Sequence, residues 1–157
     1  MVDSLIILFD QNEEAFTSNG LGALPDATSC IVTEERNGEY EVEMEYPLTG
    51  SHFHDIQKRR ILCVKPNPYD DPQPFRIYSI TKPINGIVTV HAAHLSYDTS
   101  GSIVKLFPAD AGSASAAMSY LKNFSVPSTP FTFFTNVGKT GTMSVPKPSS
   151  IRSLLGG

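Results

Sequence analysis

Long basic runs are missing from this sequence, and the longest one consists of Lys58, Arg59 and Arg60. The formal net charge is -4 at pH 7. Proteins that bind nucleic acids neutralise many successive phosphates with lysine and arginine. Nucleic-acid binding is therefore not expected, and we interpret the basic triplet as a solvated turn ahead of a buried strand.

Cysteine is equally scarce, because Cys30 and Cys63 are the only two in the chain. Neither belongs to a CxxC or CxxH pattern. Zinc sites and disulfide frameworks are recognised by such spacings, so the sequence predicts neither of them. We interpret both cysteines as small core residues.

A run of about 18 apolar residues, which a membrane-spanning helix needs, is also missing. Asp3 stands where a secretory signal would have a basic region, and residues 5–9 are predicted to be a first strand instead. We expect a soluble protein that is made inside a cell.

Charged residues make up only 18% of the chain and tryptophan is absent, whereas apolar residues make up 40%. This composition is typical of globular proteins and not of disordered ones. A monomer usually carries more surface charge than this. The low charge predicts an uncharged polar surface that meets other subunits.

The first hairpin is predicted from two strand-like runs, residues 27–36 and 39–46, on either side of an Asn-Gly pair. A two-residue loop would set Glu34 opposite Glu41, which like-charge repulsion disfavours. A three-residue loop with a glycine bulge keeps the apolar side chains on one face, so we predict that register. Its pairs are Val32 with Val42, Cys30 with Met44, Thr33 with Glu41 and Ile31 with Glu43.

Further strands are predicted along the next segment of the chain. Residues 60–65 form a nearly continuous apolar run, which is typical of a strand buried on both faces. Residues 67–74 contain three prolines and are predicted to be an exposed connection outside any ladder. Residues 75–81 and 87–95 flank a second Asn-Gly turn at 85–86.

The connections predict the architecture of the first domain. Residues 19–26 are rich in turn formers and are predicted to be a loop, and residues 50–56 to be a loop with one helical turn. Two hairpins and several lone strands favour a small barrel, or a strongly curved sheet that closes its edges. We therefore predict a β-barrel-like domain over residues 1–100.

Residues 101–157 are predicted to begin a second, mixed α/β domain, which makes the fold class α+β and mainly β. Residues 113–124 place apolar side chains at helical spacing, with Asp110 or Ser113 as the cap. Residues 131–135 are predicted to be a strand, and residues 149–155 to start another helix. The helix is expected to present one apolar side formed by Ala117, Met118, Leu121 and Phe124.

The histidines are the first candidates for chemistry. His91 and His94 are three positions apart, and on a strand such side chains point to opposite faces, so they are not expected to chelate one ion. His52 and His54 share a face only if the chain is extended there, and Asp55 is the only neighbour that could add a ligand. We predict no metal site.

The acidic residues are the second candidates. Glu41, Glu43 and Glu45 alternate along a predicted strand, as paired glycosidase carboxylates could, but they also match the solvated face of a hairpin, which we favour. Asp70 and Asp71 lack the pattern of a calcium loop.

Motifs for nucleophiles and phosphates are not met either. The sequence has no G-x-S-x-G elbow, and residues 138–142 lack the first glycine of a phosphate loop, so a hairpin turn is expected there. The sequence thus predicts no catalytic, cofactor-binding or metal-binding residue.

Several segments keep the order and spacing of a known family. They are Asn-Gly-Leu-Gly-Ala-Leu-Pro-Asp at 19–26, Val-Thr-Glu-Glu-Arg-Asn-Gly at 32–38, Glu-Val-Glu-Met-Glu-Tyr-Pro at 41–47, Pro-Gln-Pro-Phe-Arg-Ile-Tyr at 72–78, Ile-Thr-Lys-Pro-Ile-Asn-Gly-Ile at 80–87 and His-Leu-Ser-Tyr-Asp at 94–98. Through them the chain resembles the N-terminal region of phage minor structural proteins, the tail-associated hub or prophage tail endopeptidase family of siphophages that infect Gram-positive bacteria. The resemblance extends more weakly to residues 130–134 and 150–157.

This resemblance implies a homotrimeric tail-tip hub of β-barrel domains, which joins the tail tube or distal tail protein to a tip fibre or spike. The expected location is the tail tip of a virion assembled in the host cytoplasm. In longer relatives a peptidoglycan-degrading or fibre domain follows, and no catalytic residue of the family maps onto this chain. We therefore expect no enzyme activity from it. A tail-associated peptidoglycan hydrolase and a module that binds host-surface glycans stay open as alternatives.

Overall fold

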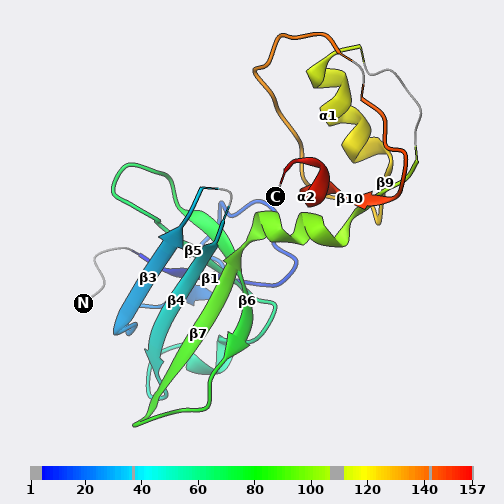
Figure 1. Cartoon of the computed structure of the whole chain (residues 1–157). Coiled ribbons are helices and arrows are strands. Elements are labelled where there is room, and N and C mark those ends of the chain that lie inside the picture. Colours follow the sequence, from blue (N-terminus) through cyan, green and yellow to red (C-terminus); the bar gives the residue numbers. More distant parts are fainter. Residues whose placement is uncertain (1–4, 37, 107–111, 142, 157) are drawn as a thin grey trace. The chain divides into compact units, whose positions relative to one another are not determined.

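A computed structural model of the chain describes residues 5–36, 38–106, 112–141 and 143–156 (Figure 1). The chain divides into two compact units, Met1–Leu95 and Ser96–Gly157. It is mainly β, as predicted, with helices concentrated in the second unit. The predicted domain boundary after residue 100 stays a prediction.

The N-terminal unit is built on one antiparallel sheet that forms a half-barrel. Its spatial order is β2-β1-β5-β6-β7-β4-β3. The strands are β1 (Ile7–Phe9), β2 (Gly22–Ala23), β3 (Ser29–Glu34), β4 (Tyr40–Pro47), β5 (Ile61–Val64), β6 (Gln73–Ile80) and β7 (Ile87–His94).

The predicted β-barrel-like form is confirmed as a half-barrel. The predicted closure of the sheet edges is wrong for the part of the chain that the structure describes, because the outermost strands β2 and β3 do not pair with each other. The physical reason is the length of β2, which has two residues and offers too few ladder bonds to complete a barrel. The described part of the sheet therefore ends in two open edges, at β2 and β3.

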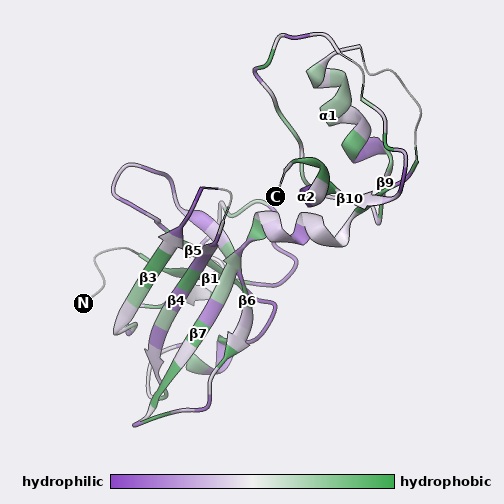
Figure 2. Ribbon diagram, viewed as in Figure 1, coloured by the Kyte–Doolittle hydropathy of each residue, from purple (hydrophilic) through white to green (hydrophobic). Residues whose placement is uncertain are grey.

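The core fills the concave side of this sheet. On β4 the side chains alternate, so that Val42, Met44 and Tyr46 are buried while Glu43 and Glu45 are exposed. Figure 2 shows the same alternation of hydrophilic and hydrophobic residues along β4. The other strands contribute further apolar residues to the core, among them Leu8, Leu62, Phe75, Ile77, Val88 and Val90.

The register predicted for the first hairpin is confirmed. The pairs are Cys30 with Met44, Ile31 with Glu43, Val32 with Val42 and Thr33 with Glu41. At the turn, Gly38 N donates to Glu35 O at 3.0 Å and Glu35 N donates to Glu39 O at 2.7 Å. The loop thus has three residues, and its middle residue, Asn37, lies outside the described residues.

The second Asn-Gly hairpin is also confirmed. Asn85 and Gly86 have φ angles of 51° and 78°, as a type I′ turn requires. Ile84 and Ile87 exchange both backbone hydrogen bonds across it, at 2.9 and 3.0 Å. Further along this hairpin the β6–β7 register shifts between Ile77 and Ser79.

Two predicted connections contain short paired segments, which corrects the sequence-based boundaries. The loop predicted at 19–26 holds β2, which pairs with β1. The proline-rich segment predicted to stay outside any ladder ends with the first residues of β6, where Pro74 pairs with Cys63. Proline is tolerated there because β7 pairs with β6 only from Phe75 onward, so β6 has a single neighbour at that position.

Strand β5 is buried on both faces, as predicted. Leu62 and Val64 face the core, whereas Ile61 lies on the other side with Phe9, under the segment that follows β1. Phe16 contacts Phe9 edge to face at 5.3 Å. Arg76 fastens this segment, because its Nη1 donates to Gln11 O at 3.0 Å and to Arg59 O at 2.8 Å.

Helical turns border the half-barrel. The single turn predicted within residues 50–56 is the 3-10 helix η1 (Phe53–Asp55). A second 3-10 helix, η2 (Leu95–Gly101), follows β7.

The C-terminal unit has its own small core of Val104, Leu121, Val145 and Ile151. Its elements are β8 (Ile103–Val104), α1 (Ala114–Asn123), β9 (Ser125–Val126), β10 (Ser149–Ser150) and α2 (Ile151–Leu154). Strand β8 lies between β9 and β10. Within the same unit, the Arg152 guanidinium lies 3.8 Å from the centre of the Tyr97 ring.

Both predicted helices of this unit are confirmed. Ser113 caps α1 by accepting a hydrogen bond from Ala116 N at 3.2 Å, and Ser150 caps α2 through Ser153 N. Asp110, the other predicted cap, lies outside the described residues.

The predicted apolar side of α1 is only partly correct. Ala117 and Leu121 are buried and Met118 packs against the core, but Phe124 is exposed. Phe124 follows the last helical residue with φ −101° and ψ 6°, and its ring lies edge to face with Tyr120, with centres 5.9 Å apart.

The strand predicted at residues 131–135 is wrong, because these residues form no ladder. Their burial does alternate, with Phe131, Phe133 and Thr135 half-buried. Alternation was the basis of the prediction, yet a strand also needs a neighbour, and β8 is already flanked by β9 and β10.

Candidate functional site

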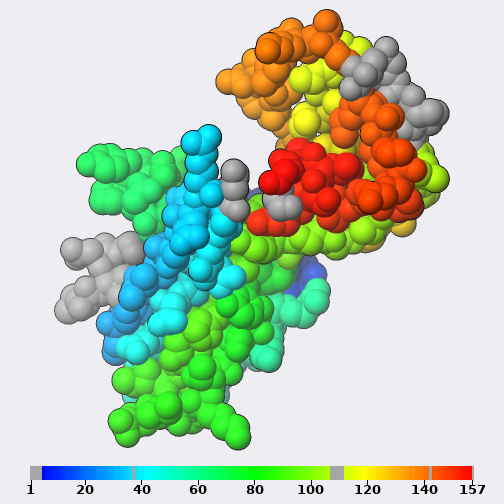
Figure 3. All heavy atoms as spheres, viewed as in Figure 1, coloured from blue at the N-terminus to red at the C-terminus, as the bar shows by residue number. Residues whose placement is uncertain are grey.

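The candidate site is the convex side of the sheet, which we call the outer face. It consists of the side chains on β3, β4, β7 and β6 that point away from the core. Among the described residues of the N-terminal unit, no other segment lies over β3, β4 and β7 in the space-filling view (Figure 3). The outer face includes Ser29, Ile31, Thr33, Glu41, Glu43, Glu45, Arg76, Tyr78, Thr89, His91 and Ala93.

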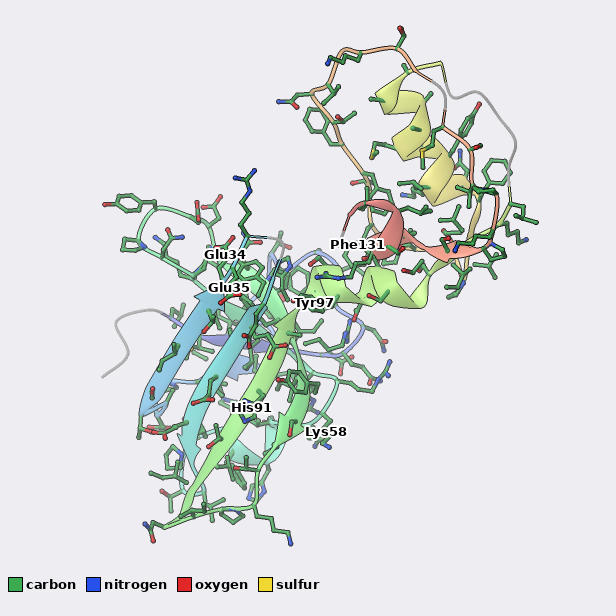
Figure 4. All side chains as sticks on the ribbon, viewed as in Figure 1. Glu34, Glu35, Lys58, His91, Tyr97 and Phe131 are labelled. Carbon is green, nitrogen blue, oxygen red and sulfur yellow. The ribbon has the colours of Figure 1, made fainter. Side chains whose placement is uncertain are left out.

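The sheet register brings three of these side chains into one row. Glu43 pairs with Ile31 on one side and with His91 on the other. His91 Nδ1 lies 3.7 Å from Glu43 Oε2, and the His91 ring stacks on Tyr78 with centres 6.2 Å apart. Figure 4 shows His91 in the middle of this face, on β7. With Tyr78 added beside His91, the row runs from the exposed Ile31 to the Glu43 carboxylate and on to an aromatic pair.

The pKa of Tyr78 reflects the negative charge of the outer face. Its hydroxyl donates to Glu41 Oε2 at 2.6 Å. This hydrogen bond, together with partial burial and the charges of Glu41, Glu39 and Glu43, raises the pKa of Tyr78 to about 12. The pKa is raised because the neighbouring carboxylates would repel the negatively charged phenolate of Tyr78.

The Glu41→Gln substitution is expected to bring the pKa of Tyr78 back toward its ordinary value of 10.0. Because the folded-state pKa is raised, the stability that Tyr78 contributes is complete below pH 10 and is lost as the pH rises toward 12. Nuclear magnetic resonance of ¹³C-labelled tyrosine checks this, with Tyr78→Phe identifying the resonance. An unchanged midpoint in Glu41→Gln would contradict the assigned cause.

The alternating glutamates lie where the sequence predicted, on the solvated face of the first hairpin. Glu43 and Glu45 are exposed and Glu41 is half-buried. Paired glycosidase carboxylates act in a site that excludes water. The side chains of Glu43 and Glu45 are instead exposed to solvent.

The four histidines lie in three different places of the N-terminal unit. His91 is on the outer face, whereas His94 is on the inner side, where its ring stacks on Tyr40 at 4.5 Å and meets Phe75 at 5.4 Å. His52 and His54 are not on an extended chain, because His52 has a φ of 61° and precedes η1. Among residues that the structure describes, no three His, Cys, Asp or Glu side chains gather so that they could hold a metal ion.

The basic triplet lies in a turn before β5, as expected. Lys58 and Arg59 are exposed, and Arg59 has a φ of 75°. Arg60 Nη1 lies 3.2 Å from Asp55 Oδ1, and His52 Nδ1 lies 3.1 Å from Asp55 Oδ2. These hydrogen bonds, from His52 first and then from Arg60, lower the pKa of Asp55.

Both cysteines are free thiols that pack with apolar residues. Cys63 is buried, and Cys30 is half-buried against the core. Burial raises the pKa of Cys30 to about 11 and also raises that of Cys63. Thiols with raised pKa values are poor nucleophiles at neutral pH.

Two further segments considered in the sequence are the proline-rich loop and residues 138–142. Asn67 organises the proline-rich loop, since its Oδ1 accepts from the backbone N of Tyr69 and Asp70 at 2.9 and 3.0 Å. The hairpin turn expected at 138–142 joins no paired strands among the described residues, and residue 142 lies outside them.

Within the described helices, none is long and apolar enough to cross a membrane.

No protein-family model, curated protein or solved structure matches this chain. Sequence reasoning singled out Glu41, Glu43 and His91 separately but missed Tyr78 and Arg76. Tyr78 follows the buried Ile77 and points outward by the ordinary alternation of β6, but its contact with His91 depends on the pairing of β6 with β7, which no residue pattern in the sequence marks.

Proposed function

We propose that this chain is a structural component of a phage or prophage tail tip, part of the hub that joins the tail tube to the tip fibre or spike. The tail identity is supported by the series of segments that resemble tail-hub proteins. Those segments include the turns at 19–26 and 80–87, both strands of the β3–β4 hairpin and the start of β6. They thus belong to the half-barrel itself.

The observation that carries an assembly role is the open half-barrel. A small β protein that works alone usually closes its sheet or covers its edges. Here the described strands leave β2 and β3 at open edges and the outer face in solvent. Such a sheet is suited to a position between other subunits, which complete what the single chain leaves open.

Labelling of tail particles tests this proposal. The full-length protein that contains this chain, carrying an epitope tag, is expected to co-purify with tails from a culture of its host, and gold-labelled antibody is expected at the tip. Purified tails are expected to hold three copies per particle by quantitative mass spectrometry, as a trimeric hub requires. Label along the tube, or tails without the protein, would refute the hub role.

A cell-wall assay separates the hub from the hydrolase alternative. Embedded Gram-positive cell walls are expected to stay uncleared by this chain in a zymogram. Clearing that disappears in Glu43→Gln would favour a hydrolase, because Glu43 is an exposed carboxylate and this substitution keeps its size while removing its charge.

A further inference from the structure

One row of backbone groups on strand β3 has no strand beside it among the described residues. Glu35 N donates to Glu39 O at 2.7 Å, which makes these two residues a hydrogen-bonded pair. Such pairs alternate along an antiparallel ladder, so Thr33 and Ile31 also bond to β4. The N–H and C=O groups of Cys30, Val32 and Glu34 consequently point away from β4, toward the open edge.

The sequence of β3 gives this edge little protection, because its one charged residue, Glu34, is the last of the strand. Natural edge strands are usually guarded by lysine, proline, a bulge or an inward charge, or they are very short. Strand β3 has six residues and contains neither lysine nor proline. Its outward side chains Ser29, Ile31 and Thr33 are small or β-branched, and Ile31 is 57% exposed. This composition favours the addition of another strand.

The negative charge beside the β3 edge favours a positively charged partner. Of the 16 acidic residues in the chain, six lie in the hairpin of β3 and β4, where Arg36 is the only Lys or Arg. They are Glu34, Glu35, Glu39, Glu41, Glu43 and Glu45. Figure 4 shows Glu34 and Glu35 together at the end of β3. A second copy of this chain would bring the same negative hairpin to the edge, whereas a basic segment would be attracted.

We propose that the β3 edge binds an extended, basic segment of a partner protein, which adds to the sheet as a further antiparallel or parallel strand. The backbone of Cys30, Val32 and Glu34 supplies the main-chain hydrogen bonds. The new strand lies about 4.8 Å from β3 and thus about 9.6 Å from β4. Long lysine or arginine side chains on its outer side reach Glu43 and its neighbours.

The pleat also defines the other half of the recognition pattern. Every second side chain of the added strand points to the core side, where Cys30 and Val32 are half-buried. Apolar residues fit these positions. The partner segment therefore alternates basic and apolar residues. This inference rests on the edge and its charge and does not depend on the tail identity.

Fluorescence anisotropy with synthetic peptides tests the proposal. The probe is an eight-residue peptide of alternating lysine and valine, compared with a glutamate-valine peptide and with a lysine-valine peptide that carries a central proline. The full chain is expected to bind the first peptide at least about tenfold more tightly than the other two, because a difference of about 1.4 kcal/mol gives that ratio. Equal binding of all three would overturn the proposal.

Two variants locate the site. Glu43→Lys is expected to weaken the lysine-valine peptide about tenfold or more and to strengthen the glutamate-valine peptide. Val32→Pro removes an outward N–H, which edge strands tolerate, and is expected to abolish binding. Tyr69→Ala, at a residue that is 94% exposed on a separate loop, is the matched control and is expected to bind normally. Binding that survives in both site variants would place the peptide elsewhere.

Amide hydrogen exchange on the unsubstituted chain keeps the test valid if Val32→Pro fails to fold. The lysine-valine peptide is expected to slow exchange at Cys30, Val32 and Glu34 and to leave the β2 edge unchanged. Slowing at these amides without peptide, and only at high protein concentration, would indicate self-pairing and overturn the proposal. Peptide binding by a chain that never joins tails would refute the tail proposal alone, and tail incorporation without peptide binding would refute this inference alone.

Discussion

The Phe75→Ala substitution is expected to destabilise the N-terminal unit by about 3–5 kcal/mol, as large-to-small changes of buried aromatic residues do. Phe75 is fully buried and pairs with both Leu62 and His94 across the sheet. It also meets the ring of Tyr40 edge to face at 5.1 Å. Since domains of this size are stable by only about 5–15 kcal/mol, this loss removes much of the fold's margin.

Urea unfolding followed by circular dichroism measures this effect. Tyr69→Ala is the control, because the Tyr69 side chain is 94% exposed and its removal is expected to change stability by about 0.5 kcal/mol or less. A loss in Phe75→Ala as small as that of the control would mean that β6 does not pack against the core as described.

The Gly20→Ala substitution is expected to have the second large effect, about 3 kcal/mol. Gly20 has a φ of +57°, where an alanine costs about 1–2 kcal/mol. A Cβ there would also lie 2.3 Å from the backbone oxygen of Leu8. That oxygen accepts a hydrogen bond from Leu21 N at 2.7 Å, so the shift needed to relieve the contact also strains the attachment to β1.

Gly86→Ala separates the steric part from the conformational part. Gly86 has a φ of +78°, but an added Cβ would meet nothing within 4 Å. We expect a loss of about 1 kcal/mol for this variant in the same urea experiment, which reflects the backbone conformation alone. Equal losses of unfolding free energy in the Gly20 and Gly86 variants would show that β1 shifts without cost to make room for the added methyl group.

Local patterns predicted the hairpins well, because the determining interactions lie within a few residues. The Asn37-Gly38 pair and the unfavourable Glu34–Glu41 contact were enough to select the register of β3 and β4 that the structure has. The second Asn-Gly turn followed from the same local requirement for positive φ.

Predictions that depend on distant partners were weaker. Residues 131–135 alternate in burial but lack a neighbouring strand, and the sequence does not reveal whether one is available. The short strand β2 depends on β1, more than ten positions earlier, for its pairing. Closure of the barrel likewise depends on two edges that are formed far apart in the chain.

The outer face was predicted only in part, because its contacts also join distant parts of the chain. The alternating glutamates followed from period two, and the separation of His91 from His94 followed from the pleat. The contacts of Tyr78 with Glu41 and His91 join three strands, so only the folded sheet reveals them.

The strand order also dictates when this fold can arise during synthesis. Strand β1 lies beside β5, and β4 lies beside β7, so early strands wait for partners made much later. The β3–β4 hairpin has its partner next to it and can form as soon as it leaves the ribosome, whereas the half-barrel needs the chain up to His94. On a nascent chain, only the short β1–β2 pair is complete before this acidic hairpin, which is therefore the first pair of long strands to take shape.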